Sequence, residues 1–378
     1  MAVDPKDLSP VFFGKERPTH VGPIAVQQSP LAGRGLFTTR AVKAGECLFC
    51  TPPTVDADPR VVRDEWNEGD SVDEVAERVL VAAMRDALAD SSASGPVWSF
   101  LALMGGGVAC DETCTSIDQL LGRKDSNLPD VCLTDDELLQ IVRQNAFGPD
   151  GLVTSARIGQ EWSSGSNLLP TRILGLYPLA AMINHSCVAN AIPVYVDSLM
   201  VVHARNDLPA GTELVWGYIP PTLPYNQRQK LLSERGFCCS CDRCREEENV
   251  VLSTQDVDRL EQEVLPSLAS NQLRRYVRVS LAIPYREYLQ SHDDIIPTLL
   301  QLHLAFCDVD NASLYHISLL QSAYRLTQST KQAAFWVEQL KKAHQIRYGW
   351  LGHQLEHVRA ALIHTQKLPN NNIDASLT

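Results

Sequence analysis

A segment dense in cysteine is the part of the sequence best suited to binding a metal ion. Four cysteines lie within it: Cys238, Cys239, Cys241 and Cys244. The surrounding residues are polar, so these side chains are poor candidates for packing in a core. Zn²⁺ binds four thiolates in a tetrahedron and stabilises small loops, and the spacing therefore predicts a zinc site. A set of thiols without a metal is the alternative.

The cysteines of this segment need not all bind the same ion. In extended backbone, neighbouring side chains point in opposite directions, so either Cys238 or Cys239 should face elsewhere. A further ligand must then come from a distant part of the chain. Cys187, which ends the Asn-His-Ser-Cys sequence at 184–187, is the candidate.

Two other arrangements of reactive side chains deserve comparison. His185 and Ser186 cannot act as a base and a nucleophile for acyl transfer, because adjacent residues do not provide that geometry and no G-x-S-x-G elbow accompanies them.

A second four-cysteine zinc site is a lesser alternative, and its ligands would be Cys47, Cys50, Cys110 and Cys114. The first two lie on a strand-like segment, where a core role fits better.

Short motifs follow one another along the chain in a recognisable order. They are Gly33-Arg34-Gly35, Gly45-Glu46, Gly175-Leu176-Tyr177-Pro178, Asn184-His185-Ser186-Cys187, Gly211-Thr212-Glu213-Leu214, Tyr218, and the C-x-C-x-x-C of Cys239, Cys241 and Cys244. This order resembles that of SET-domain lysine methyltransferases over roughly residues 20–245. The G-L-Y-P segment, the Asn-Ala-Phe element at 145–147 and the helical C-terminus are most similar to the SMYD branch. Residues 51–100 contain no cysteine or histidine, so we expect no MYND zinc finger.

The resemblance implies a fold and a division of the chain. The expected class is α+β, with short twisted β-sheets, a pseudoknot, a helical insertion, a zinc-bound post-SET segment and an all-α, TPR-like C-terminal module. The expected parts are the N-terminal part of the SET domain at 1–60, a mostly helical insertion at 61–140, the C-terminal catalytic part at 141–222, the zinc-binding post-SET segment at 223–250 and the helical domain at 251–378.

The resemblance also implies an activity, which is methyl transfer from S-adenosyl-L-methionine to lysines of histones or other proteins. It makes Tyr218 catalytic and Phe147 a substrate-binding residue. The implied cofactor-binding residues are Gly33, Arg34, Gly35, Asn184, His185 and Phe237, and the implied zinc ligands are Cys187, Cys239, Cys241 and Cys244. Core packing remains an alternative for the three aromatic residues, and plain turns remain alternatives for the glycines and for the Asn-His pair.

One residue departs from the family pattern. Arg235 occupies a position where SMYD-type enzymes usually have a tyrosine of the lysine channel. A guanidinium there would repel an incoming lysine unless it turned to solvent or paired with an acid such as Glu234. The alternative function is therefore a weakly active or inactive SET-fold scaffold that recruits proteins through its helical C-terminal domain.

The expected elements would hold these residues in place. Strand-like segments with glycine turns cover about 20–50 and 172–218, and they carry most of the motifs. Between them, residues 61–92 have apolar positions at helical spacing, and Thr134 with Glu137 predicts a capping box at the start of another helix. From about 255 onward the apolar spacing is helical almost throughout.

Charge and composition narrow the classes of partner. Apolar residues make up 44% and charged residues 21%, which predicts a folded chain rather than a disordered one. The formal charge of −12 opposes binding to phosphate backbones, so a nucleic-acid-binding zinc module is disfavoured and a basic protein segment is the expected partner. We find no signal-peptide core and no membrane-spanning run, and expect a cytoplasmic or nuclear protein that is not secreted.

Overall fold

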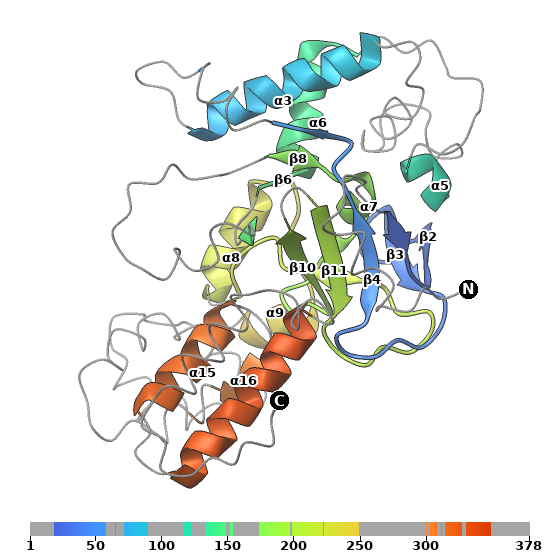
Figure 1. The fold of residues 1–378 in the computed structure, drawn as a ribbon. Coiled ribbons are helices and arrows are strands. Elements are labelled where there is room, and N and C mark those ends of the chain that lie inside the picture. The colour runs from blue at the N-terminus through green and yellow to red at the C-terminus, as the bar shows by residue number, and fades with distance from the viewer. Residues whose placement is uncertain are drawn as a thin grey trace. The chain divides into compact units, whose positions relative to one another are not determined.

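A computed structural model describes residues 19–57, 65, 72–89, 116–121, 133–148, 152–153, 174–196, 199–221, 223–248, 300, 303–304, 306–307, 311, 314–326 and 330–348 (Figure 1). The chain forms two compact units. Unit 1 combines residues 1–154, 164–184 and 193–215, and unit 2 combines residues 155–163, 185–192 and 216–378. Much of the expected helical domain, including residues 251–299, lies outside the described residues.

A five-stranded sheet provides the core around the N-terminal motifs. Its strands follow the order β1 (His20–Val21), β4 (Cys47–Thr51), β11 (Leu199–Ala204), β10 (Ala191–Val196) and β7 (Leu152–Val153). Every residue of β11 is buried, which matches its continuous apolar sequence. β4 runs antiparallel to both of its neighbours, and Cys50 pairs with Val201 in this register. The β-strands expected at both ends of the SET pattern are confirmed.

A hairpin of β2 (Ile24–Gln28) and β3 (Arg34–Thr38) carries the glycine-rich turn. Ser29 closes the turn, because its backbone N–H donates to the carbonyl of Gly33 over 2.8 Å and its hydroxyl accepts from the N–H of Leu31. Gly33 has φ +50°, a left-handed conformation that costs glycine little and other residues more.

A three-stranded sheet and two helices complete the described part of unit 1. The sheet order is β5 (Val55–Asp56), β8 (Gly175–Leu176) and β6 (Ala146–Phe147). Helix α6 (Asp135–Asn145) leads directly into β6 and packs against α3 (Val72–Ala89). Thr134 and Glu137 form the predicted capping box at the start of α6. The short helices α5 (Ile117–Leu120) and α7 (Pro178–Ala181) also belong to this unit.

Unit 2 contains the cysteine segment and the C-terminal helices. α8 (Tyr225–Ser233) and α9 (Asp242–Glu247) flank the cysteine segment, and α15 (Leu314–Leu326) packs against α16 (Thr330–Tyr348). The strands β9 (Asn184–His185) and β12 (Val215–Trp216) form a two-stranded sheet. The helical content of 314–348 agrees with its apolar spacing, while the TPR-like arrangement stays a prediction.

Among the described helices, none combines the length and the apolar character that crossing a membrane requires. α3 and α16 are long enough, at 18 and 19 residues, but both contain several charged side chains.

Candidate functional site

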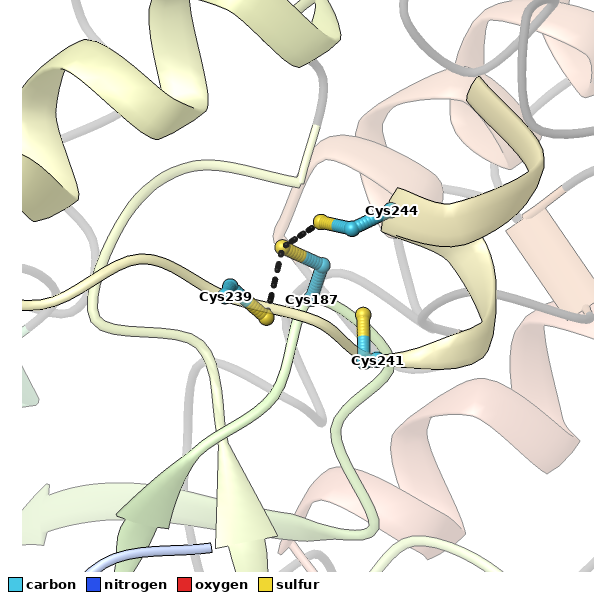
Figure 2. Close-up of side chains that lie close together, drawn as sticks. All are labelled: Cys187, Cys239, Cys241 and Cys244. Carbon is cyan, nitrogen blue, oxygen red and sulfur yellow. Dashed lines mark hydrogen bonds between the residues drawn. The ribbon is translucent and has the colours of Figure 1, made fainter. Parts of the chain in front are cut away.

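Four cysteine side chains from two distant segments of unit 2 converge on one point (Figure 2). Cys187 follows β9, Cys239 and Cys241 precede α9, and Cys244 lies in the first turns of that helix. The Sγ atom of Cys187 is 3.9 Å from that of Cys239 and 3.5 Å from that of Cys244. All four sulfurs lie within 4.8 Å of one another.

These distances suit a tetrahedral zinc ion. Zn–S bonds of about 2.3 Å place two ligand sulfurs about 3.8 Å apart, a value that lies between the two separations measured from Cys187. Cys238 is exposed and is not among the four. The structure therefore separates the two adjacent cysteines, as alternating side-chain direction requires, and brings together the four cysteines that the sequence analysis grouped.

The cluster favours the thiolate, which is the form that zinc binds, at two of its cysteines and the protonated thiol at the other two, Cys187 and Cys244. The hydrogen bond from Cys187 lowers the pKa of Cys239, and Cys187 likewise lowers the pKa of Cys241, to about 6. The same hydrogen bonds raise the pKa of Cys187 itself. Protons are thus divided unequally among four sulfurs that lie in contact, a state that a divalent cation relieves.

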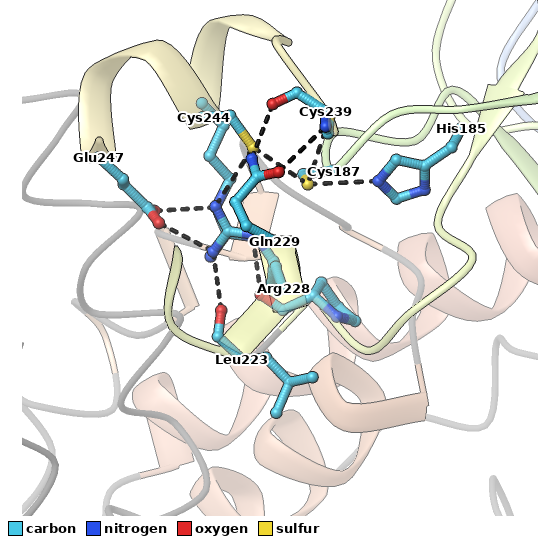
Figure 3. Close-up of polar contacts among 10 residues, drawn as sticks. His185, Cys187, Leu223, Arg228, Gln229, Cys239, Cys244 and Glu247 are labelled. Atoms are coloured by element: carbon cyan, nitrogen blue, oxygen red, sulfur yellow. Dashed lines mark hydrogen bonds and ion pairs between the residues drawn. The ribbon is translucent and has the colours of Figure 1, made fainter. Parts of the chain in front are cut away.

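A buried arginine next to the cluster offsets its negative charge (Figure 3). Arg228 of α8 is fully buried, and its guanidinium donates to Sγ of Cys244 over 3.7 Å and pairs with Glu247 over 2.8 Å. Arg243, also fully buried, pairs with the other oxygen of Glu247 over 2.9 Å. Burial by itself lowers the pKa of Arg228, but Glu247 and the neighbouring cysteines outweigh this and raise it. Four thiolates around Zn²⁺ would carry a net charge of −2. Arg228 and Arg243 together with Glu247 carry a net charge of +1, which partly compensates for the charge of the zinc site.

The backbone of the cysteine segment is fixed by the neighbouring helix. Gln229 of α8 donates from Nε2 to the carbonyl of Cys239 over 2.7 Å and accepts from the N–H of Cys239 over 3.1 Å. These two hydrogen bonds hold the loop that carries Cys239 and Cys241 in place, and they do not depend on a bound metal.

Three aromatic rings meet beside the cluster. The ring centroid of His185 is 5.2 Å from that of Tyr218 and 5.8 Å from that of Phe237, and the last two are 6.1 Å apart. The backbone N–H of Tyr218 donates to Nδ1 of His185 over 3.0 Å. Nδ1 is therefore the acceptor nitrogen, so in the neutral ring Nε2 carries the hydrogen and points it at Sγ of Cys187, 3.4 Å away.

Arg235 contacts one of these three rings, that of Tyr218. Its guanidinium carbon is 5.7 Å from the centre of the Tyr218 ring, within the range of a cation–π contact, and the side chain is exposed. The arginine thus remains in contact with solvent while it covers one face of the tyrosine.

In unit 1, the side chain of Asn184 holds the glycine-rich turn. Its amide donates to the carbonyls of Ala32 and Arg34 over 3.3 and 3.0 Å, and to Oε1 of Glu213 over 2.8 Å. Ser29 donates its hydroxyl hydrogen to the same carboxylate oxygen over 2.7 Å. The turn, the N-H-S-C sequence and the G-T-E-L sequence are therefore joined by one hydrogen-bonded group.

Gly35 is required by this packing. A Cβ atom at Gly35 would lie 2.5 Å from Oε1 of Glu213, which is too close unless that side chain shifts, and 3.2 Å from Nδ2 of Asn184, which is a tight contact. Glycine is therefore set at this position by a close approach rather than by a left-handed conformation.

Phe147 lies on β6 in unit 1, and its ring contacts Tyr177 edge to face, with the centroids 6.3 Å apart. Tyr177 in turn contacts Tyr195 at 6.0 Å. Phe147 is half-buried, whereas Tyr177 is only 3% exposed. The residue predicted to bind substrate is thus the more accessible end of an aromatic row.

The cysteines considered for a second site do not form one among the described residues. Cys50 is buried in β4, and the thiol of Cys47 donates to the carbonyl of Phe49. Burial raises the pKa of Cys47 to about 12, so both behave as protonated core residues. Cys110 and Cys114 lie outside the described residues.

Sequence reasoning did not assign roles to several residues of these groups, among them Glu213, Arg228 and Gln229. Glu213 belongs to a motif that the sequence analysis quoted, and an acid within that motif was the available signal. Arg228 and Gln229 gave no signal, because charged and amide side chains on a helix are usually exposed.

Comparisons with known proteins agree with this placement of motifs. The SET domain family model matches residues 33–219. A Gibberella zeae protein named methyltransferase is 28% identical over 240 residues, which are 60% of this chain and 31% of that protein. The Arabidopsis thaliana histone-lysine N-methyltransferase ASHR2 is 36% identical over 29% of this chain and 27% of its own length. Human histone-lysine N-methyltransferase SMYD3 is 32% identical over 22% of this chain and 18% of its own length.

The chain thus matches less than a third of the length of each of these relatives. The matched family model begins at the glycine-rich turn and ends just after Tyr218, so it includes the motifs from Gly33 to Tyr218, whereas the C-x-C-x-x-C segment lies beyond it. The predicted resemblance is confirmed over residues 33–219, which match the SET domain, and parts of this chain are similar to proteins named histone-lysine methyltransferases.

Proposed function

We propose that this chain transfers methyl groups from S-adenosylmethionine to lysine side chains of other proteins. The observation that carries the proposal is the contact of Tyr218, His185 and Phe237 in unit 2. These residues come from three separate motifs, and a SET-domain methyltransferase would use all three. The names of the relatives support the same reaction.

Different residues of the chain would bind different parts of the methyl donor. In unit 1, Asn184 holds the turn at Gly33, Arg34 and Gly35, whose backbone would face the methionine part of the cofactor. In unit 2, Phe237 would stack near its adenine, since a flat apolar ring stacks well on a base, and His185, whose ring lies 5.8 Å from that of Phe237, would also bind the cofactor.

The chemistry requires alignment rather than a covalent intermediate. When bound, S-adenosylmethionine would supply a methyl group on a positively charged sulfur. The lysine nitrogen forms the new N–C bond with its lone pair while the C–S bond breaks, so the amine must first lose a proton. We assign to the Tyr218 hydroxyl the task of orienting amine and methyl, and burial beside a positive sulfur would favour the neutral amine.

The zinc site would act structurally. With Cys187, Cys239, Cys241 and Cys244 as ligands, Zn²⁺ would tie the segment after His185 to the segment after Phe237. This is the post-SET zinc arrangement that the resemblance implies. The same resemblance is the basis for proposing a zinc-binding segment at 223–250 and a separate helical domain at 251–378.

The substrate would be a lysine in a basic protein segment. The net charge of −12 favours such a partner, and the half-buried Phe147 would line its channel. Histone and non-histone proteins both present such lysines, so we propose action in the nucleus, the cytoplasm or both. Neither nucleic acid nor a membrane is part of the proposal.

A second candidate function is a scaffold that binds proteins but transfers methyl slowly or not at all. The contact between Arg235 and Tyr218 favours it, because a guanidinium over the tyrosine opposes a cationic substrate. Incubation with labelled S-adenosylmethionine and a mixture of basic proteins separates the two. Labelled protein supports the enzyme, and cofactor binding without any label supports the scaffold.

A further inference from the structure

A second group of metal-binding side chains lies in the helical part of unit 2. His303, Cys307 and His316 each present one donor atom, and these three atoms lie within 4.8 Å of one another. His303 and Cys307 are four residues apart in helical backbone and so share a helix face, while His316 belongs to α15. No part of the methyltransferase proposal uses these residues.

The hydrogen bonding of His316 leaves its other nitrogen suited to a metal. Nδ1 lies 2.7 Å from the backbone carbonyl of Asn311, and since a carbonyl only accepts, Nδ1 carries the hydrogen. Nε2 of the neutral ring then has its lone pair directed at Nδ1 of His303, 2.8 Å away. A backbone carbonyl that fixes the far nitrogen is the usual support of a histidine that binds a metal.

His303 and Cys307 bring their donor atoms to the same place. Sγ of Cys307 is 3.8 Å from both ring nitrogens of His303. Two imidazoles and a thiol are a donor set that Zn²⁺ binds well.

The separations are close to those that zinc requires. Tetrahedral geometry with Zn–N bonds of about 2.0–2.1 Å and a Zn–S bond of about 2.3 Å places N and N about 3.3 Å apart and N and S about 3.6 Å apart. The two histidine nitrogens, at 2.8 Å, would separate by about half an ångström, and the sulfur, 3.8 Å from His303, is already within about 0.2 Å of its required separation from that ring.

Aromatic side chains pack against the two histidines of the group. The His316 ring stacks on Phe306 at 5.4 Å, and the His303 ring meets Trp336 edge to face at 5.8 Å. His303 and His316 are 4% and 1% exposed. Burial of two imidazoles among apolar rings costs stability unless their nitrogens are fully used. A hydrogen bond between the histidines uses one nitrogen of each, but it does not explain why a thiol converges on the same point.

We propose that His303, Cys307 and His316 form a second zinc site, which ties the helical residues 303–304 and 306–307 to α15 within the helical module. Three protein ligands leave one position of the tetrahedron for water or a further donor. The proposal concerns metal binding alone, so it stands or fails independently of methyl transfer.

The test measures zinc in the full-length chain after saturation with Zn²⁺ and removal of the excess by gel filtration. Wild-type protein should hold about two zinc ions, and Cys307→Ser and His316→Gln should each lose about one of them. The matched control is His344→Gln, which alters another buried histidine of the same module and should keep the wild-type content. If both cluster variants keep the wild-type content, the proposal is wrong.

Zinc X-ray absorption of the wild type gives a second readout that needs no variant. The Cys187 cluster alone would give a shell of sulfur only, whereas the second site adds imidazole nitrogen. Nitrogen scattering that disappears in His316→Gln supports the site. A sulfur-only shell in the saturated wild type overturns it, even if the variants prove too unstable to purify.

Discussion

The backbone N–H of Tyr218 donates to Nδ1 of His185 over 3.0 Å. The opposite nitrogen of the same ring lies 3.4 Å from Sγ of Cys187, a member of the cysteine cluster. One buried imidazole therefore connects the proposed catalytic tyrosine with the proposed zinc site. The position of Tyr218 depends on a side chain whose own orientation the cluster fixes.

Substitution of His185 should test this connection. His185→Leu removes the acceptor for the Tyr218 N–H, and loss of one such hydrogen bond, worth about 1–1.5 kcal/mol, should lower the rate of methyl transfer about tenfold. His185→Asn can place an oxygen near the Nδ1 position and should recover part of that loss. Steady-state kinetics of the two variants provide the measurement. Equal rates for Leu and Asn would show that the acceptor is unimportant.

Gly35→Ala should weaken binding of S-adenosylmethionine. The added methyl group would lie 2.5 Å from Oε1 of Glu213, so the hydrogen bonds that hold the turn must shift. We expect a loss of affinity of about tenfold or more, which corresponds to about 1.4 kcal/mol. Gly148→Ala is the control, because nothing lies within 4 Å of the added atom. Calorimetric titration measures both, and unchanged affinity in Gly35→Ala would contradict the role of the turn.

Cys241→Ser should remove the sulfur-bound zinc and destabilise unit 2, because structural zinc contributes directly to folding. Cys238→Ser is a closely matched control. It alters an exposed cysteine of the same segment and should leave metal content and thermal stability unchanged. Metal analysis with thermal denaturation makes the comparison. Loss of zinc in Cys238→Ser but not in Cys241→Ser would show that the ligands are wrongly assigned.

Arg228→Met should be strongly destabilising. It removes a buried cation from Glu247 and from the sulfur of Cys244, and breaking such a buried pair typically costs about 3–5 kcal/mol. Arg245→Gln breaks an exposed ion pair with Asp242 and should cost less than about 1 kcal/mol. Chemical denaturation gives both free energies of unfolding. Similar values for the two would show that Arg228 is not important for the cluster.

The sequence predicts those parts of the fold and site that depend on local spacing. The capping box at Thr134 follows from residues three positions apart, and the buried face of α3 follows from helical periodicity. The convergence of Cys187 on the C-x-C-x-x-C segment could be predicted only with the help of the family resemblance. Cys187 and Cys239 are 52 residues apart in the sequence, and local spacing does not predict contacts over that distance.

The remainder depends on tertiary contacts that spacing does not encode. Arg228 and Glu247 are fully buried although both residue types are usually exposed, because each provides the charge that the other needs. The group at His303 and His316 has no recognisable zinc-binding motif, and only the packing of the helices brings it together. The sequence predicts that Arg235 turns to solvent or pairs with an acid, but it does not predict the contact of its guanidinium with the Tyr218 ring.

The most direct test compares methyl transfer and cofactor affinity in the wild type and in Tyr218→Phe. If the hydroxyl orients the amine and the methyl, its removal should lower turnover by about thirty- to a thousandfold, which corresponds to about 2–4 kcal/mol. Affinity for S-adenosylmethionine should stay within a few-fold, because Asn184 and the Gly33 to Gly35 turn remain in place. Undiminished transfer by Tyr218→Phe, or a wild type that binds the cofactor but methylates no protein, would contradict the account.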